Sequence, residues 1–403
     1  MEILRQLYDM TAMGEIGETP GVLLMILIGA VLLYLGIVKK YEPLLLVPIG
    51  FGIVLANLPG GSMDVVPSEM VELPGHRYMN LFEIASEYGI MNFVYYSLIK
   101  TGFLPPIIFM GVGALTDFGP MLRNLRLAFF GAAAQIGIFG VFFGAIALGF
   151  SPKEAGSLGI IGGADGPTAI YTTILLAPHL LGPIAIAAYS YMALVPVIVP
   201  LVANRLMTKN EFRINMKKQD KLYPPKYKIK NIKTVKIIFP IVLGVAVAIL
   251  VPSSVPLLGM LLFGNLIKEI GTATSRLSDA ATGPIMNTAT IFLGLAVGAT
   301  MTAKVFLDFK TLGIIVGGFL AFAISIAGGI LAVKGYNLIA KKKINPLVGA
   351  TGLSAVPMAS RVANELGLKH DSSNHLLQYC MASNISGVIG SAVAAGVLIS
   401  ILG

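Results

Sequence analysis

A single carboxylate stands inside a long apolar stretch of the chain, in surroundings typical of an ion site. The motif that contains it is Gly162-Gly163-Ala164-Asp165-Gly166-Pro167-Thr168-Ala169-Ile170-Tyr171. Asp165 is the sole Asp, Glu, Lys or Arg between Glu154 and Arg205. An ionised Asp at membrane depth costs roughly 2.5–3.5 kcal/mol on insertion scales, and Gly and Pro leave backbone groups that lipid cannot satisfy. Such a segment must be buried in protein or line a water-filled cavity, and we therefore interpret it as a broken helix that holds an ion site.

Asp165 has an alternative interpretation as a helix-capping carboxylate near the membrane surface, because Asp-Gly-Pro is good turn chemistry. The isolation of this charge within uncharged sequence favours the ion site. A carboxylate so placed can exchange Na⁺ for H⁺, which would couple the two ions.

Oxygen atoms are the ligands that a hard monovalent cation prefers, whether they come from hydroxyls, amides or freed backbone carbonyls. Besides Asp165, the side chains that offer such oxygens near glycine or proline in apolar segments are Thr168, Asn345, Ser354, Asn384 and Ser386. Each of these five is equally compatible with ordinary polar helix packing. Tyr191 is compatible with an interface tyrosine or a proton relay, and Arg361 with a phosphate partner or an anion anchor near the cavity.

The composition is that of an integral membrane protein built from helices. The chain has 403 residues, of which 56% are hydrophobic and 12% charged, and its mean hydropathy is +0.83. Soluble domains are about 45–50% apolar and about 25% charged. The single cysteine, Cys380, excludes an internal disulfide. Residues 1–20 lack a basic start followed by a short apolar core, so we expect no cleaved signal peptide.

The net charge of +9 comes almost entirely from one loop, residues 207–236. Ten Lys or Arg residues and two acidic residues lie between Lys209 and Lys236. This concentration is typical of a cytoplasmic loop between spans and not of a nucleic-acid-binding protein. Docking of an acidic soluble partner is the alternative role. A second basic cluster, Lys341-Lys342-Lys343, follows after four apolar segments, so both clusters can face the cytoplasm.

The chain divides into two halves of a single membrane domain, residues 1–403. The first half, 1–206, contains the broken helix around Asp165, and the second half, 237–403, is interrupted at 345–361 and at 383–391. Interrupted segments at comparable places in two halves are the best sequence indication of a transporter's ion site. We therefore predict about 10–11 transmembrane segments in two inverted repeats, with broken or re-entrant helices and with Asp165 facing Asn384.

Two motifs resemble the beta subunit of sodium-pumping biotin-dependent decarboxylases. The first is the Asp165 motif with the following Tyr189-Ser190-Tyr191-Met192; the second runs from Lys343-Ile344-Asn345-Pro346-Leu347-Val348-Gly349 through Ser354-Ala355-Val356-Pro357-Met358 to Arg361. The resemblance extends from about Tyr41 to the C-terminus, apart from a loop at 58–90 that is short for the family. This family includes oxaloacetate, glutaconyl-CoA, methylmalonyl-CoA and malonate decarboxylases.

The resemblance implies an activity and site residues. A carboxyltransferase subunit would move a carboxyl group onto biotin, and this membrane subunit would then decarboxylate carboxybiotin, consume a proton and export Na⁺. The implied catalytic residues are Asp165, Tyr191, Ser354 and Arg361. Those implied to serve the cofactor are Asn345, Gly349 and Arg361, and Asn384 matches the second broken-helix site.

The resemblance also implies an assembly. The fold would be elevator-like, and the chain would form a homo-oligomer, such as a trimer, in the inner membrane of a prokaryotic cell. Its partners would be carboxyltransferase and biotin-carrying subunits and a small membrane subunit. The chain contains no Met-Lys-Met biotin acceptor, so we expect biotin on a partner.

Two other functions compete with this one. A secondary Na⁺-coupled carboxylate transporter would use the same inverted-repeat logic, but it would move solute without a biotin partner. A purely structural membrane anchor would leave the charge of Asp165 unexplained.

Overall fold

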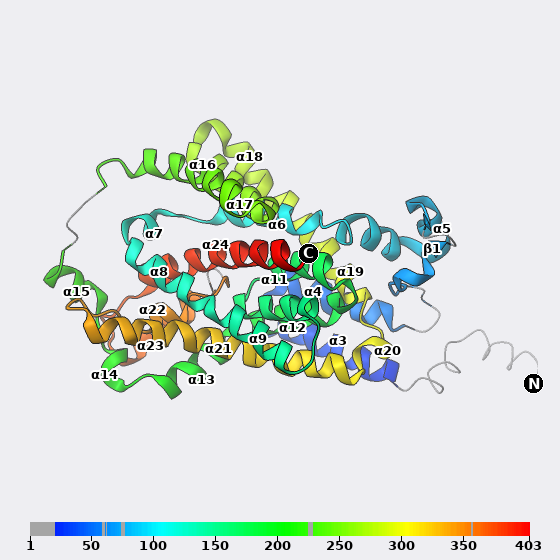
Figure 1. The fold of residues 1–403 in the computed structure, drawn as a ribbon, viewed down its shortest axis with the longest axis horizontal. Helices are drawn as coiled ribbons and strands as arrows, with labels where there is room; N and C mark the ends of the chain where they lie inside the picture. The colour runs from blue at the N-terminus through cyan, green and yellow to red at the C-terminus, as the bar shows by residue number, and fades with distance from the viewer. Residues whose placement is uncertain (1–20, 59–60, 62, 74–76, 225–228, 356–357) are drawn as a thin grey trace, which may run out of the picture.

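The computed structural model describes residues 21–58, 61, 63–73, 77–224, 229–355 and 358–403. Within these ranges the chain is almost entirely helical (Figure 1), and one small antiparallel pair joins β1 (Glu72–Leu73) to β2 (Arg77–Tyr78). The predicted all-α class is confirmed. The expectation about a signal peptide falls on residues 1–20, which lie outside the described residues, as do Val356 and Pro357 of the second motif.

Among the described residues, six helical segments are long and apolar enough to cross a membrane. They are Leu125–Ala147, Ile232–Leu250, Pro252–Ile270, Thr272–Ala299, Thr311–Ile339 and Leu377–Leu402. Two bent pairs, Leu81–Ile99 with Leu104–Leu115 (66°) and Pro178–Met192 with Val195–Leu206 (69°), raise the number to eight. The predicted 10–11 segments exceed this number because hydropathy also selects short or interrupted apolar helices, such as α3 (Gly21–Ile37) and α4 (Pro43–Ala56).

Glycines let the outer helices approach one another closely. The helices α6 (Leu104–Leu115) and α17 (Val255–Ile270) cross at two of them: a Cβ on Gly113 would lie 1.9 Å from the Leu261 carbonyl oxygen, and one on Gly264 would lie 1.9 Å from that of Met110. A Cβ on Gly52 of α4 would likewise lie 2.4 Å from the Leu295 carbonyl oxygen of α19 (Met286–Ala299). Close backbone approach replaces the hydrophobic driving force that lipid removes.

The remaining elements complete the chain. They are η1 (Ser68–Met70), α5 (Leu81–Val94), η2 (Tyr95–Ile99), α7 (Gly119–Arg123), α8 (Leu125–Ala134), α9 (Ile136–Ala147), η4 (Pro178–Leu180), α12 (Leu181–Ala193), α13 (Val195–Leu206), α16 (Ile232–Leu250), η5 (Pro252–Ser254), η6 (Thr272–Thr274), α18 (Ser275–Ala280), η7 (Ala281–Ile285), α20 (Ala303–Phe306), α21 (Phe309–Ile339) and α24 (Leu377–Leu402).

A first helical hairpin, residues 152–176, contains Asp165. It consists of α10 (Pro152–Gly159), the 3₁₀ turn η3 (Ile160–Gly163) and α11 (Gly166–Leu176), and it breaks at Ala164, whose φ of 54° is left-handed. Its two ends lie together, because His179 Nε2 is 3.1 Å from Glu154 Oε1. A Cβ on Gly156 would also contact both Leu176 and Leu402. The hairpin therefore starts and ends at the C-terminal end of α24.

A second hairpin, residues 345–370, enters from the other end of α24. It consists of α22 (Leu347–Ala350), a non-helical tip and α23 (Met358–His370). Asn345 and Asn374, which flank the hairpin, both donate through Nδ2 to the carbonyl oxygens of Phe212 and Ile214, at 3.0 to 3.2 Å. The tips of the two hairpins meet, since the Ser354 N–H donates to the Gly163 carbonyl oxygen at 3.0 Å.

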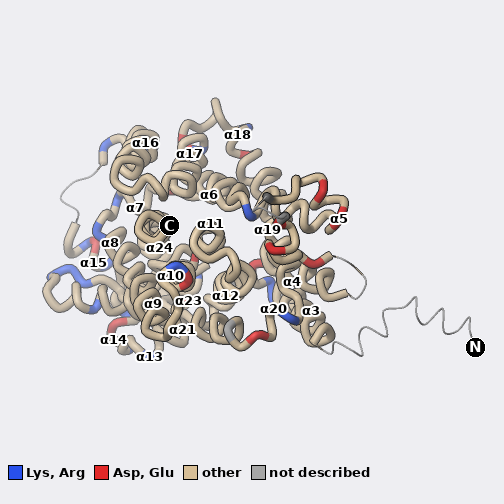
Figure 2. The backbone as a smooth tube through the Cα atoms, turned by 45° about the vertical axis from the view of Figure 1, so that its right-hand side comes forward, with Lys and Arg blue, Asp and Glu red and all other residues tan. Residues whose placement is uncertain are grey.

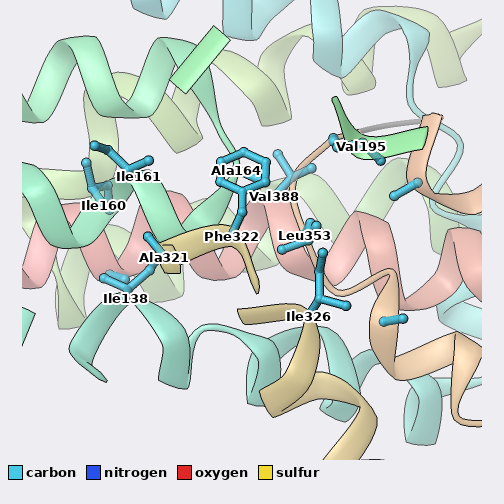
Figure 3. Packing of buried hydrophobic residues seen from close by; sticks show 14 of the residues in the cluster. Ile138, Ile160, Ile161, Ala164, Val195, Ala321, Phe322, Ile326, Leu353 and Val388 are labelled. Atoms are coloured by element: carbon cyan, nitrogen blue, oxygen red, sulfur yellow. The ribbon is translucent and has the colours of Figure 1, made fainter. Parts of the chain in front are cut away.

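Apolar side chains from both hairpins surround this meeting point. Figure 3 shows Ala164 and Leu353, from the two tips, in one cluster with Phe322 of α21 and Val388 of α24, and all four are buried. The polar groups at the tips are therefore enclosed by apolar side chains.

The interruption predicted at 383–391 is wrong. The helix α24 runs as one α-helix of 26 residues through Ser383, Asn384 and Ser391. These polar residues contact their neighbours through side chains and leave the helical backbone bonds intact. In the second half of the chain the break lies at the tip of the second hairpin.

The basic segment, residues 209–222, lies where both ends of the second hairpin meet. It contains α14 (Lys209–Phe212) and α15 (Met216–Leu222), and its side chains Phe212 and Met216 are buried. Phe212 stacks on His370 with ring centroids 4.2 Å apart. Hydrogen bonds from Ser373 and Asn215 hold the pKa of Asp371 at about 2. Figure 2 shows Lys and Arg gathered around α13, α14 and α15.

The contact between Gly329 of α21 and Gly349 of α22 gives a prediction about stability. A Cβ on Gly349 would lie 2.0 Å from the Gly329 carbonyl oxygen, so Gly349→Ala should lower the free energy of unfolding by about 1–3 kcal/mol. The matched control is Gly328→Ala, because nothing lies within 4 Å of a Cβ there. The buried thiol of Cys380 lets a thiol-reactive fluorophore report thermal unfolding, and equal Tm values for the two variants would contradict the packing role.

Candidate functional site

Asp165 caps α11 and is almost fully buried. Its Oδ1 accepts the Thr168 N–H at 3.2 Å, and its Oδ2 accepts the hydroxyls of Ser354 (2.7 Å) and Ser391 (2.8 Å). The residue is 4% exposed. No Lys, Arg or His within the described ranges forms an ion pair with it. A buried carboxylate in this state must bind a cation or a proton, because desolvation of the bare charge is too costly.

Two buried amides hold the tip of the second hairpin against this carboxylate. Asn384 Nδ2 donates to the carbonyl oxygens of Leu353 at 2.6 Å and Thr351 at 3.2 Å. Gln135 Nε2, at the junction of α8 and α9, donates to the Gly352 carbonyl oxygen at 2.9 Å. Ser354 is therefore presented to Asp165 by helices that belong to both halves of the chain.

Several buried side-chain oxygens on the helices that surround Asp165 have no hydrogen-bond partner among the described residues. They are Gln135 Oε1, Thr168 Oγ1, Thr172 Oγ1, the Tyr189 hydroxyl, Ser325 Oγ, Ser383 Oγ and Asn384 Oδ1. Some lie directly against the break: a Cβ on Gly163 would be 3.5 Å from Gln135 Oε1, and one on Gly162 would be 3.1 Å from Ser325 Oγ. The Tyr189 ring packs on Gly166, where a Cβ would be 2.1 Å from Tyr189 Cε1. Buried polar atoms of this kind require water or an ion as a partner.

This set of donors suits Na⁺. It offers one carboxylate, which balances one positive charge, together with neutral hydroxyl and amide oxygens. Hard cations take oxygen ligands, whereas Zn²⁺ and similar metals favour His and Cys. Within the described part of the chain, no group of three or more His, Cys, Asp or Glu side chains gathers anywhere.

The structure brings together only some of the residues predicted for the site. Asp165, Thr168 and Ser354 are in direct contact, and Asn384 joins them through the tip of the second hairpin. Tyr191 instead donates to the Ile315 carbonyl oxygen of α21 and packs against Phe319 and Phe322.

The other predicted residues lie in different contacts. Asn345 donates to the basic segment, and its Oδ1 accepts the Leu347 N–H at 3.0 Å. Gly349 packs against α21, and Ser386 Oγ donates to the Ala128 carbonyl oxygen of α8 at 2.6 Å. Arg361 is exposed on α23. It lies near Glu42, whose pKa is raised by burial while the positive charge of Arg361 opposes the rise.

Sequence reasoning did not select Ser391, Gln135, Ser325, Thr172 or Tyr189. Ser391 belongs to the predicted 383–391 segment, and Tyr189 stands two residues before the tyrosine that was chosen. Gln135 and Ser325 are each an isolated polar residue in a long apolar helix. This isolation is the sequence feature that could have identified them as site residues.

Comparison with known proteins identifies the family of the chain. Residues 21–402 match the family model described as Na⁺-transporting oxaloacetate decarboxylase beta subunit. The chain belongs to this family. It is 48% identical to the methylmalonyl-CoA decarboxylase subunit beta of Propionigenium modestum, over 97% of each chain. It is 42% identical to the oxaloacetate decarboxylase beta chain of Klebsiella pneumoniae, over 99% of each chain.

A further relative is a probable oxaloacetate decarboxylase beta chain of Vibrio cholerae serotype O1, which is 46% identical over 93% of this chain and 94% of its own. The resemblance found from the two motifs is therefore confirmed. So are its main implications, a multi-pass helical beta subunit of the Na⁺-transporting decarboxylases.

The amide of Asn384 gives a prediction about this beta subunit. Asn384→Ala would leave the buried carbonyl oxygens at the tip without their donor, and should lower the free energy of unfolding by about 1–3 kcal/mol. Ser386→Ala, two residues along the same helix and only partly buried, should cost clearly less. Thermal unfolding, followed through Cys380, compares the two variants, and an equal or larger loss for Ser386→Ala would refute the role given to Asn384.

Proposed function

We propose that this chain is the membrane subunit that decarboxylates carboxybiotin and couples the release of CO₂ to Na⁺ export. The observation that carries the proposal is the buried Asp165 carboxylate, held without a cationic side chain at the contact of two hairpins. The family of the chain and the names of its relatives support the decarboxylase complex.

The reaction balances with one proton. The N–CO₂⁻ bond of carboxybiotin breaks, CO₂ leaves, and the electron pair that remains on the ureido nitrogen takes up a proton to form N–H. Asp165 binds Na⁺ as a carboxylate and releases it when it is protonated. A proton that enters through Asp165 can thus both displace Na⁺ and be consumed by the decarboxylation. Ser354 and Ser391 orient the carboxylate, and the orphaned oxygens around the tips complete the shell of the cation.

Two hairpins that enter from opposite ends of α24 support an inverted-repeat, elevator-like arrangement. Each hairpin crosses only part of the bundle, and the tips meet at Asp165. The ion site is then separated from each side of the membrane by one hairpin, as alternating access requires. The catalytic and cofactor roles of Tyr191, Arg361, Asn345 and Gly349 stay predictions, because their contacts lie away from the carboxylate.

We further propose that the cationic face of the basic segment docks the biotin-carrying or carboxyltransferase subunit at the cytoplasmic side of a prokaryotic inner membrane. Its exposed residues are Lys209, Arg213, Lys217, Lys218 and Lys221. The buried Phe212 and Met216 fix these charges to the second hairpin. A small membrane subunit and further copies of the chain complete the assembly.

The central test uses the purified protein in liposomes, supplied with carboxybiotin and radioactive Na⁺. Wild type should take up Na⁺ in proportion to the CO₂ released, and Asp165→Asn should reduce uptake to background, because an amide cannot alternate between a cation and a proton. Asp279→Asn, which changes an exposed carboxylate, is the control and should leave uptake unchanged. Na⁺-independent decarboxylation, or Na⁺-driven carboxylate flux without CO₂ release, would overturn the proposal, and the second result would favour a secondary transporter.

The docking role is tested by replacing Lys217, Lys218 and Lys221 together with Gln. Association with the soluble subunits should weaken, as it should for wild type at high salt, because screening reduces attraction between exposed charges. Lys304→Gln, on α20 near the other end of α21, is the control. Pull-down of the complex at low and high ionic strength measures the effect of the substitutions and the effect of salt. Intact assembly of the triple variant would refute the docking role.

A further inference from the structure

A polar cavity of about 220 Å³ opens beside the basic segment, away from Asp165. Its walls come from α7, α15 and the first turns of α16 and α24. Pockets for drug-sized ligands measure about 300–1,000 Å³, so this cavity fits a small head group. The mechanism above does not use it.

Two ion-pair clusters form the fixed part of the wall. Lys236 Nζ lies 2.8 Å from Asp117 Oδ1 and 2.9 Å from Glu269 Oε1. Asp220 accepts from Lys342 Nζ and from the Tyr379 hydroxyl, each at 2.6 Å. These charges largely neutralise one another, so they position the wall without making it strongly anionic or cationic.

Three side chains on the wall of the cavity are available to bind a ligand. Arg123, Asn124 and Gln378 line the cavity, and none has a side-chain hydrogen bond or ion pair with another described residue. A guanidinium binds a carboxylate through two parallel N–H donors. A primary carboxamide both donates and accepts, which matches a group that carries an N–H beside a C=O.

We infer that this cavity is the entry subsite for the carboxylated ureido head group delivered by the soluble carrier. Arg123 would bind the carboxylate, and Asn124 and Gln378 would bind the ureido N–H and C=O. The inference rests on the proposed function for the identity of the ligand. The position supports it, because the cavity adjoins the segment at which the carrier is expected to dock.

The cavity and the ion site share one rigid element. Gln378 and Tyr379 stand in the first turn of α24, and Ser391 of the same helix donates to Asp165. At 1.5 Å per residue, Gln378 and Ser391 are about 20 Å apart along the helix. The subsite therefore binds the head group and does not take part in proton transfer at Asp165.

The test compares Arg123→Gln with Arg126→Gln, an exposed arginine on the neighbouring α8 that does not line the cavity. In liposomes containing the full chain, Arg123→Gln should raise the KM for carboxybiotin by about tenfold, the loss expected for a bidentate charge-assisted contact. The kcat and the Na⁺ concentration for half-maximal rate should not change. The control should match wild type, and a KM for Arg123→Gln equal to that of the control would overturn the inference.

A binding measurement separates this inference from the proposed function. Free biotin carries the ureido group but not the added carboxylate. It should therefore raise the Tm of wild type and of Arg126→Gln, but not of the double variant Asn124→Ala/Gln378→Ala, whether or not the preparation decarboxylates. If wild type shows no Na⁺-coupled turnover but biotin still raises its Tm, the proposed function is refuted and the inference about the cavity is not. A shift produced by phosphatidylglycerol vesicles and not by biotin would assign the cavity to a lipid head group and overturn the inference.

Discussion

The arrangement of the molecule depends on the cost of keeping one carboxylate in a dry interior. Asp165 is buried among apolar side chains of both hairpins, α21 and α24. Among the described residues, only hydroxyls and a backbone N–H donate hydrogen bonds to the Asp165 carboxylate. A permanent Lys or Arg partner would remove the cost but also the need for an exchangeable ion. The absence of such a partner there leaves the carboxylate dependent on an exchangeable cation or proton.

The glycine contacts follow from the same constraint. Interrupted backbone can exist at membrane depth only where protein surrounds it, so helices must close on the hairpin tips without leaving gaps. Gly349 against Gly329, and Gly352 against Gly131 and Ala134, bring the second hairpin into backbone contact with α21 and α8. These glycines therefore help to enclose the polar tips of the hairpins.

Sequence reasoning reached the class of the protein and the core of its candidate site, because an isolated Asp beside Gly and Pro in apolar sequence has few explanations. It reached Ser354 and Asn384 for the same reason. It predicted the interruption at 345–361, where the tip of the second hairpin lies, but it added a break at 383–391 that α24 does not have, because polar residues and glycines within this helix have the same local pattern as a broken helix. It chose Tyr191 over Tyr189, and it missed Gln135 and Ser325, because only the packing of distant helices shows which polar side chain points at the break.

The paired asparagines that flank the second hairpin have a mechanical consequence. Asn345 and Asn374 both donate hydrogen bonds to the same two carbonyl oxygens, those of Phe212 and Ile214. The basic segment and both ends of the hairpin are thereby joined into one unit, and the tip of that hairpin contacts Asp165 through Ser354. Any displacement of the basic segment would therefore change the position of the hairpin relative to the carboxylate.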